Sequence, residues 1–550
     1  MAKNDVFDRN ILALSKRNPA LASRLLQADT QRSLYTILES RNGDKIPAWL
    51  DPTGAPHPLH SIMNPGKEAK RLIDTVESEN FLILLGLGGG YYAEAALERD
   101  DIGMVLVIEY GLSGLAELFC KIDYTRFFED ARFRLFADVS DRELEEHILE
   151  LYQPVLYGGI RVIPMRSRTE QDSKPFIMAG NAIQAAIDRI SADYSVQAHF
   201  GKRWFSNIIR NLKTVEPIEK SVPQISRAAV TAAGPSLSMQ IPELRKKRNE
   251  LFLIATDTSL PCLLHEEMVP DAVISIDCQH ISHYHFMDGL PESVTLFLDI
   301  ASPPLLSGLS NKLQFFSTGH PLTRYVSRIW KTMPLLDVSG GNVTYAAISL
   351  AEQLGATKIE LYGADFSYPG GAAYARGAYI HSFFGKTQNR FAPLEAQSSA
   401  FLYRTPLSKI SRSENSWYYE TGTLKFYREK LEEKSKKIDA EIIPVAGLGA
   451  PINIRQRTHK EKHQKEFSGG KATMKAEGFL EHYRNAITRL PKPGKNTAEY
   501  LASLQEKERD LFTTLLPAAA SLKQRKSGKN FAELFETAKA YSLSQIKALL

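Results

Sequence analysis

Short apolar runs alternate with helical patterns through the middle of this 550-residue chain, and this alternation restricts the fold more than any other feature. Helical segments such as IPELRKKRN and NVTYAAISLAEQLG separate runs rich in Val, Ile, Leu and Phe. Buried strands joined by helices form parallel sheets with helices on both faces. The sequence therefore predicts an open, doubly wound α/β domain. Its six predicted strands are 227–233, 251–257, 272–277, 294–301, 312–318 and 358–366.

A similar pattern begins nearer the N-terminus, at Phe81. The segment FLILLGLGGGYYAEAALE is typical of a strand, a glycine loop and a helix, and MVLVIEY at 104–110 is typical of a second buried strand. A strand, a helix and a second strand in this order make a βαβ unit. We therefore expect a Rossmann-like domain before the central one.

The glycine loop of that unit is a candidate cofactor site. The segment Gly86–Gly90 follows a strand and precedes a helix, and Glu109 ends the next strand about twenty residues later, as in dinucleotide or S-adenosylmethionine fingerprints. Tyr91 and Tyr92 follow at once, and their bulk would crowd a pyrophosphate. A bound cofactor and a purely structural turn are both open at this point.

The chain is longer than one hydrophobic core usually spans, so several domains are expected. From Arg455 onward, 19 Lys and Arg stand against 10 Asp and Glu. Aromatic residues are not interleaved with these charges, so we interpret the basic tail as a solvated helical face and expect no nucleic-acid partner. The predicted parts are an N-terminal mixed segment (1–80), a Rossmann-like domain (81–216), a central catalytic α/β domain (217–455) and a basic helical C-terminal module (456–550).

Cysteine content and hydropathy argue against other protein classes. The three cysteines lack CxxC spacing, which disfavours a disulfide framework or a structural zinc site. The start, MAKNDVFDRN, has acids where a signal peptide needs a basic region and an apolar run. No uncharged apolar segment reaches the roughly 18 to 20 residues of a membrane span. We expect a cytoplasmic protein without a membrane span, and the oligomeric state is open.

Polar residues follow the predicted strands of the central domain, at the carboxyl edge where α/β sheets bind ligands. Glycine lets a backbone approach a ligand closely, and a helix start offers N–H groups to an anion such as a phosphate. Several polar ends that converge on one edge predict a ligand cleft. The predicted nucleotide-binding residues are Gly234, Pro235, Ser236, Asp257, Thr258, Asp277, Ser339, Gly340, Gly341, Asn342 and Asp365.

Several of these segments together resemble one family. GPSL after a strand, PDAVISID, SGGNVTYAAISLAEQLG and IELYGADFSYPGG are similar to the motility-associated factor (Maf) glycosyltransferases, which share a domain with 6-hydroxymethylpterin pyrophosphokinase (MptE-like) proteins. LHSIMNPGKEAKRLID resembles the N-terminal region of the same family, and the resemblance covers most of residues 35–455. It implies transfer of a nonulosonic, sialic-acid-like sugar from a CMP-activated donor to Ser or Thr of flagellin.

A more distant resemblance to bacterial sialyltransferases implies roles for single residues. The Gly234–Ser236 turn would hold the phosphate and ribose of CMP, and Ser339 with Gly340 would contact the nucleotide from the facing side. Asp257 and Asp277 stand where those enzymes have asparagines, which puts the transfer of that role in doubt. One of the tyrosines after the last predicted strand would steady the leaving phosphate, the candidates being Tyr368, Tyr374 and Tyr379.

The chemistry requires neutralisation of a departing phosphate and deprotonation of a hydroxyl acceptor. The predicted catalytic residues are His381 as the base, Arg376 as the partner of the sugar carboxylate or phosphate, and Asp277; His320 is a second candidate base. A divalent metal is left open, since sialyltransferase-like sites work without one. If a metal binds, its predicted ligands are Asp257, Asp277 and Asp299.

Three other functions remain open. A pyrophosphokinase of the pterin type would use Mg-ATP, although the segment Ile276–His280 offers one aspartate, Asp277, where the related enzymes have two close together. A non-catalytic accessory protein that binds flagellin would rely on the basic C-terminal helices. A methyltransferase would be built on the Gly86–Gly90 loop.

Overall fold

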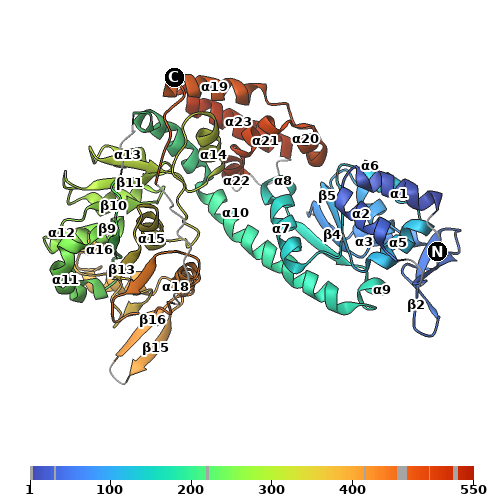
Figure 1. Cartoon of the computed structure of the whole chain (residues 1–550), viewed down its shortest axis with the longest axis horizontal. Coiled ribbons are helices and arrows are strands. Elements are labelled where there is room, and N and C mark those ends of the chain that lie inside the picture. The colour runs from blue at the N-terminus through green and yellow to red at the C-terminus, as the bar shows by residue number, and fades with distance from the viewer. Residues whose placement is uncertain are drawn as a thin grey trace. The chain divides into compact units, whose positions relative to one another are not determined.

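The computed structural model describes residues 4–29, 33–77, 79–217, 222–413, 416–454, 467–494, 496–523 and 531–550. The chain forms two compact units (Figure 1). The first comprises Met1–Gly201 and Arg489–Tyr541, and the second comprises Lys202–Thr488 and Ser542–Leu550. The predicted boundary at 455–456 lies outside the described residues.

The first unit contains a four-stranded parallel sheet of order β6-β5-β4-β7. Its strands are β4 (Phe81–Leu85), β5 (Met104–Glu109), β6 (Phe133–Ala137) and β7 (Ile160–Pro164). Residues 81–85 and 104–109 are buried without interruption, which is the pattern of parallel strands covered on both faces. The predicted Rossmann-like arrangement is therefore confirmed.

A small antiparallel sheet, β1-β2-β3, and short helices also belong to this unit, together with most of the long helix after Ser173 and the C-terminal helices up to Tyr541. The strands of the small sheet are β1 (Tyr35–Glu39), β2 (Lys45–Leu50) and β3 (Pro56–Pro58). The helices are α1 (Asp5–Ser15), α2 (Pro19–Gln27), α3 (Pro65–Ile73), α4 (Tyr91–Leu97), α5 (Leu112–Lys121), α6 (Thr125–Glu129), α7 (Asp141–Leu151), α8 (Pro154–Tyr157) and α9 (Arg166–Thr169).

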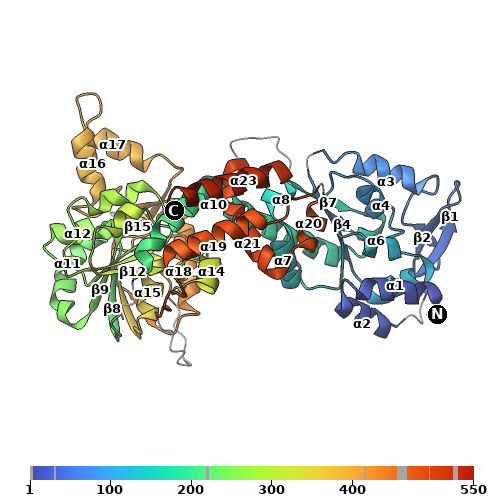
Figure 2. The ribbon, with the colours of Figure 1, turned by 90° about the horizontal axis from the view of Figure 1, so that it is seen from above.

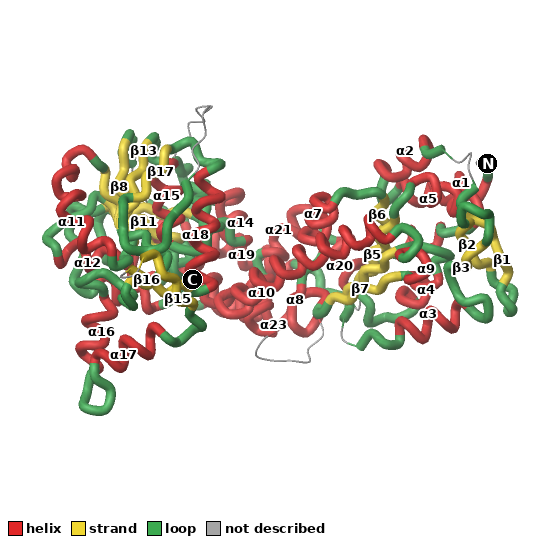
Figure 3. Tube along the Cα trace, turned by 90° about the horizontal axis from the view of Figure 1, so that it is seen from below, coloured by secondary structure: helices red, strands yellow, loops and turns green. Residues whose placement is uncertain are grey.

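The second unit is built on a seven-stranded sheet of order β12-β11-β10-β9-β8-β13-β17, all parallel. Its strands are drawn in yellow in Figure 3. The first six strands lie within the predicted runs and end one to four residues earlier, and the seventh, β17, was not predicted. The strand order reverses direction between β8 and β13, where doubly wound sheets open a crevice. The strands are β8 (Arg227–Thr231), β9 (Phe252–Thr256), β10 (Ala272–Ser275), β11 (Thr295–Asp299), β12 (Leu313–Phe316), β13 (Lys358–Tyr362) and β17 (Glu441–Pro444).

Both faces of this sheet are buried. Val230, Ile254 and Ile274 belong to a core shared with α15 (Val343–Gln353) and α18 (Gly422–Ser435). The opposite face is covered by α11 (Ser236–Lys247) and α12 (Leu260–His265), which Figure 1 shows on the side away from α15. The remaining helical segments of these crossovers are η1 (Arg248–Glu250), η2 (Asp257–Ser259), η3 (His280–Phe286), α13 (Pro304–Ser307) and α14 (Pro321–Ile329).

Between β13 and α18 the chain forms an insertion. A helical pair stands out beyond the sheet in Figure 2, and next to it in sequence comes a three-stranded sheet of order β14-β16-β15. The elements of the insertion are β14 (Tyr368–Pro369), α16 (Tyr379–Thr387), α17 (Leu394–Leu402), β15 (Ser408–Ser413) and β16 (Ser416–Glu420).

The C-terminal segment is helical, as predicted. The stretch AEYLASLQEKERDLFTTLL is divided at Leu504 and Gln505 into two helices, where Gln505 begins a new capping box with Glu508. The helices are α19 (Ala476–Arg489), α20 (Thr497–Ser503), α21 (Glu506–Thr513), α22 (Leu516–Lys523) and α23 (Phe531–Lys547).

The last turns of the 43-residue helix α10 (Ser173–Val215) belong to the second unit and hold its strand ends. The side chain of Asn207 donates to the carbonyls of Cys278 and Ala301 at 3.1 and 2.8 Å. Asn211 donates to those of Ile300 and Ser302 at 2.8 and 2.9 Å. These bonds fix the loops after β10 and β11 against α10.

Within the described parts of the chain, no helix has both the length and the apolar character needed to cross a membrane.

Candidate active site

The carboxyl edge of the seven-stranded sheet carries an aspartate beside each of three neighbouring strands. Asp257 follows β9, Asp277 follows β10 and Asp299 ends β11. Parallel strands lie about 4.8 Å apart, so these carboxylates belong to one edge. We call the three residues the acidic edge.

Asp257 is buried and held from several sides. Its Oδ1 accepts the backbone N–H of Thr258 at 2.7 Å, and its Oδ2 accepts the hydroxyl of Ser275 at 2.7 Å. The same Oδ2 lies 3.5 Å from Nδ1 of His285, in η3. Asp257 therefore links β9 to β10 and to the histidine that follows β10.

Asp277 is more open than its two neighbours, being only half-buried. Its Oδ1 accepts the backbone N–H of Gln279 at 2.9 Å. Burial raises the pKa of Asp277, and the charge of Asp257 acts in the same direction, against the hydrogen bond from Gln279. This carboxylate has free acceptor capacity for a ribose hydroxyl or a base amino group.

Asp299 forms a second carboxylate–histidine pair. Its Oδ2 accepts the hydroxyl of Thr318 at 2.9 Å and lies 3.7 Å from Nε2 of His320. The ring of His320 packs against Trp204 of α10, with 4.3 Å between centroids. Sequence reasoning missed Trp204, because it precedes the predicted domain and stands in a helical pattern without any motif.

The Gly234–Ser236 turn lies at the switch point between β8 and β13 and is closed by an internal carboxylate. The backbone N–H and hydroxyl of Ser236 both donate to Asp365, at 2.8 and 2.5 Å. The Ser236 hydroxyl also accepts the N–H of Leu448 at 2.8 Å, and Pro235 occupies the N-cap position of α11. Asp365 thus takes the place at the start of α11 that an anion would occupy.

Gly234 is needed for this arrangement. A Cβ atom there would lie 2.4 Å from Oδ2 of Asp365 and 2.4 Å from the carbonyl of Gly363. Burial raises the pKa of Asp365, and the hydrogen bonds from Ser236 oppose that shift. The turn and Asp365 come together as the sequence indicates, but their polar atoms are bonded to each other.

The Ser339–Asn342 turn is held by a network of hydrogen bonds with nearby residues. Asn342 caps α15 by accepting the N–H of Tyr345 at 3.0 Å. Asp337 accepts the N–H of Ser339 and the hydroxyl of Tyr345, each at 3.0 Å, and Lys434 donates to it at 3.1 Å. Burial opposes the shift, but the bonds from Ser339 and Lys434 lower the pKa of Asp337 to about 2.

Both glycines of this turn are packed against tyrosines. A Cβ on Gly340 would meet the Tyr345 ring at 2.1 Å, and Gly341, at a φ of +74°, lies under Tyr427. In the described chain no hydrogen bond joins this turn to the Gly234–Ser236 turn. The structure therefore gives the two turns separate sets of partners.

The segment after β13 reaches the acidic edge through tyrosines. The ring of Tyr379 lies 4.5 Å from that of His285 and 6.2 Å from that of Tyr374. Burial raises the pKa of Tyr379, and the positive charge of Arg404 opposes that shift. Arg404 is an exposed cation close to these tyrosines that sequence reasoning did not single out.

Two predicted catalytic residues of this segment are exposed to solvent, whereas Tyr379 packs against His285. Arg376 is exposed, and its backbone N–H donates to the hydroxyl of Ser238 at 3.2 Å. His381 is exposed on α16. Tyr368, in β14, pairs with Tyr419 of β16. The roles of Arg376 and His381 stay predictions.

A metal site needs several His, Cys, Asp or Glu side chains close together. The described residues contain no group of three or more His, Cys, Asp or Glu side chains placed to hold a metal ion. The acidic edge as described therefore offers at most two such donors together, and the use of a metal stays open.

The glycine loop of the first unit is filled by the protein itself. Gly89 donates its N–H to Nε2 of the buried His60 at 2.9 Å, and a Cβ on Gly88 would lie 2.6 Å from that same nitrogen. Glu109 accepts the N–H of Leu87 at 2.9 Å and pairs with Arg168 at 3.0 Å. These atoms serve internal contacts in the place where a dinucleotide would need them.

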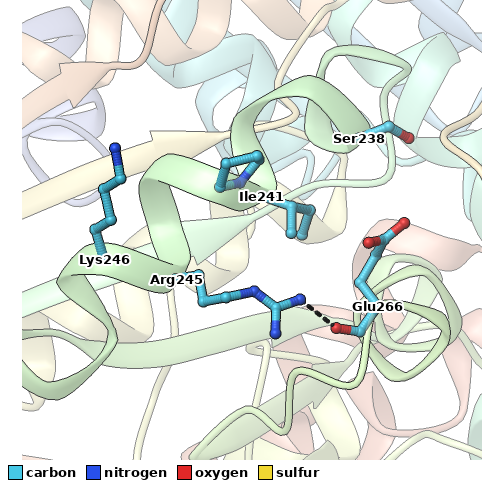
Figure 4. A pocket seen from close by; sticks show the side chains of 6 residues that line it. Ser238, Ile241, Arg245, Lys246 and Glu266 are labelled. Carbon is cyan, nitrogen blue, oxygen red and sulfur yellow. Dashed lines mark hydrogen bonds between the residues drawn. The ribbon is translucent and has the colours of Figure 1, made fainter.

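A pocket of about 430 Å³ lies along α11, and Figure 4 shows its lining side chains. Arg245 donates to the backbone carbonyl of Glu266 at 2.7 Å across it. None of the acidic-edge residues lines it, so we do not take it as the active site. Its lining residues are Ser238, Ile241, Pro242, Arg245, Lys246 and Glu266.

Comparison with protein families gives a match over residues 202–371 to the family described as 6-hydroxymethylpterin diphosphokinase MptE-like. The match begins where the second compact unit begins, at Lys202 in α10. The turns of α10 that carry Trp204, Asn207 and Asn211 thus belong to this domain in sequence as well as in structure.

Among solved structures, the chain is similar to a MAf glycosyltransferase from Magnetospirillum magneticum AMB-1, with a TM-score of 0.61 and 13% sequence identity. The likeness covers 100% of this chain and 96% of that one. The resemblance to Maf proteins with an MptE-like domain is therefore confirmed at the level of the fold.

Curated relatives include several uncharacterized proteins of Treponema pallidum. One is 36% identical over 183 residues, which are 32% of this chain and 61% of the relative. Another is 25% identical over 387 residues, or 68% of this chain and 82% of the relative. The chain thus spans less than two thirds of the length of the first of these relatives.

Proposed function

We propose that this protein is a glycosyltransferase that moves a nonulosonic sugar from a CMP-activated donor to Ser or Thr hydroxyls of flagellin. The observation that supports it most is the acidic edge of the parallel sheet, within a chain whose whole length has the fold of a MAf glycosyltransferase. Ligands of such sheets bind beyond the carboxyl ends of the strands.

The donor would bind across the acidic edge with its nucleoside toward the carboxylates. Carboxylates accept hydrogen bonds from ribose hydroxyls and from the amino group of cytosine. They repel a phosphate, so the phosphate would face the cations of the rim. Arg404 beside the tyrosines and Arg203 on α10, both exposed, supply that charge.

The reaction breaks the bond between the anomeric carbon and the phosphate oxygen of CMP, and the electron pair leaves with the phosphate. The acceptor oxygen forms the new bond to the anomeric carbon and loses its proton to a base on the protein. Arginines that face the departing phosphate stabilise the charge that develops there.

A thermal-shift experiment tests donor binding. CMP and CMP-N-acetylneuraminic acid should raise the melting temperature of the second unit, and Asp277→Asn should abolish that rise, because Asp277 is the open carboxylate of the edge. Asp288→Asn, which removes an exposed carboxylate beyond η3, should leave the rise unchanged. Stabilisation by S-adenosylmethionine alone would overturn the proposal.

A second function is favoured by one specific observation. The family match is to diphosphokinase-like proteins, and Asp257 lies near enough to Asp277 to raise its pKa, as two carboxylates that share a Mg-ATP site would. Release of AMP from Mg-ATP in the presence of 6-hydroxymethylpterin, without any response to CMP compounds, would identify this activity instead.

A further inference from the structure

His285 is held at the acidic edge by contacts that no sequence motif marks. It lies in η3, the segment that directly follows Asp277, and only 7% of the residue is exposed. The chain returns toward β9, so that Nδ1 of His285 lies 3.5 Å from Oδ2 of Asp257. A buried imidazole beside a buried carboxylate is thus built into the edge.

The ring of His285 is positioned from two sides. Asp257 is itself fixed by the hydroxyl of Ser275 and the N–H of Thr258, so its carboxylate has little freedom to turn. Tyr379 packs against the other side of the imidazole, with 4.5 Å between ring centroids and 59° between planes. These contacts set the ring in one orientation.

This orientation assigns the two ring nitrogens. A carboxylate opposite Nδ1 favours the tautomer with a proton on Nδ1, which leaves the lone pair on Nε2 to act as a base. Within the described residues Nε2 of His285 has no hydrogen-bond partner. Nδ1 also makes no hydrogen bond to the described residues, and its contact with Asp257 is the 3.5 Å ion pair. The nitrogen that would take a proton is therefore the one that does not face the carboxylate.

The other candidate histidines lack this arrangement. In His320 it is Nε2 that faces Asp299, at 3.7 Å, and Trp204 covers the ring. His381 is exposed on α16, and no described carboxylate pairs with it. A mobile solvated imidazole is a poorer base for a buried step than one held in place.

We propose that His285 is the catalytic base and that Asp257 is its positioning residue, an inference that rests on the proposed glycosyl transfer. The acceptor hydroxyl gives its proton to Nε2 of His285 as its oxygen bonds to the anomeric carbon. The bond to the phosphate oxygen breaks, and its electron pair leaves on CMP. His285 ends the step as an imidazolium, stabilised by Asp257, and later releases the proton to water.

The test compares His285→Asn with the wild type by CMP release from CMP-N-acetylneuraminic acid with recombinant flagellin as acceptor. General bases contribute about 100- to 10,000-fold, so a loss of that size is expected. The rise in melting temperature caused by CMP should stay within a degree or so of the wild type, because nucleotide contacts are kept.

Sodium azide separates a base from a structural residue. Azide is already a nucleophile without a proton to lose, so azide-dependent CMP release should be nearly the same in His285→Asn and the wild type. Asp257→Asn should lower transfer to flagellin more than azide-dependent CMP release, because both reactions use the donor and only the transfer needs a positioned base. His280→Asn, the same substitution at an exposed position of η3, is the matched control and should behave as the wild type.

The outcomes separate a failure of the His285 assignment from a failure of the proposed glycosyl transfer. If His285→Asn transfers sugar to flagellin at the wild-type rate, the assignment of the base is overturned while the proposed function stands. If azide and flagellin reactions fall together, His285 is structural and the assignment is also overturned. If the wild type itself neither binds CMP nor releases it from the donor, the proposed function fails, and this inference fails with it.

Discussion

Removal of the Ser236 hydroxyl shows whether this group stabilises the fold through internal hydrogen bonds or is available to bind a nucleotide. In the structure this hydroxyl donates to Asp365 and accepts from the N–H of Leu448, and Ser236 is 1% exposed. Ser236→Ala removes both bonds, so the buried carboxylate of Asp365 and the part-buried N–H of Leu448 each lose a partner. The bond to a charged group contributes about 1.5–3 kcal/mol and the other about 1 kcal/mol. We therefore expect a destabilisation of about 2–4 kcal/mol without any ligand present.

Urea unfolding followed by tryptophan fluorescence measures this loss, since Trp204, Trp330 and Trp417 all lie in the second unit. Ser238→Ala is the matched control two residues further along α11. Its hydroxyl accepts one exposed backbone N–H, so it should cost less than about 1 kcal/mol. If Ser236→Ala is as stable as the wild type but is no longer stabilised by CMP, the structural role of the hydroxyl is refuted. Ser236 would then be a nucleotide-binding residue.

Three further predictions concern other parts of the chain. Gly88→Ala should lower the free energy of unfolding of the first unit by about 1–3 kcal/mol, as measured by calorimetry. The added Cβ would meet Nε2 of His60, and the φ of +52° disfavours a side chain. Asn211→Ala should cost about 1–3 kcal/mol in urea unfolding, since two buried carbonyls lose their donor. Lys434→Met should destabilise the second unit near neutral pH. The folded pKa of Asp337 is lowered to about 2, so its stabilisation is present above the unfolded pKa and is lost as the pH falls toward 2. Melting curves between pH 5 and 2 should therefore converge for the variant and the wild type at the acid end, and a constant difference would contradict this.

Local patterns were enough to predict the class of fold. The six strands predicted for the central domain are present and parallel, because uninterrupted apolar runs are the mark of strands buried on both faces. The predicted runs extend past the true strand ends by up to four residues. Some overruns are polar, such as Ser317 and Thr318 after β12, and others are apolar, such as Ala232 and Ala233 after β8, so hydropathy alone does not mark where pairing stops. The strand β17 was missed because its four residues, Glu441–Pro444, are too short and too mixed to give a periodic signal.

The candidate site was only partly predictable from sequence. The aspartates of the acidic edge were recognised from their place after predicted strands, since the carboxyl ends of parallel strands share one edge. His285 was not recognised, because its importance comes from Asp257, which follows a different strand and lies 28 residues earlier. Trp204 was missed for the same reason, since its partner His320 stands more than a hundred residues away.

The sequence alone determined that the chain forms parallel α/β sheets and that carboxylates stand at one sheet edge, because hydrophobic periodicity and turn residues act over a few positions. Only the tertiary structure decided which polar groups are already bonded. Ser236 and Asp365 are 129 residues apart, and a hydrogen bond between them depends on distances of a few tenths of an ångström that no local pattern encodes.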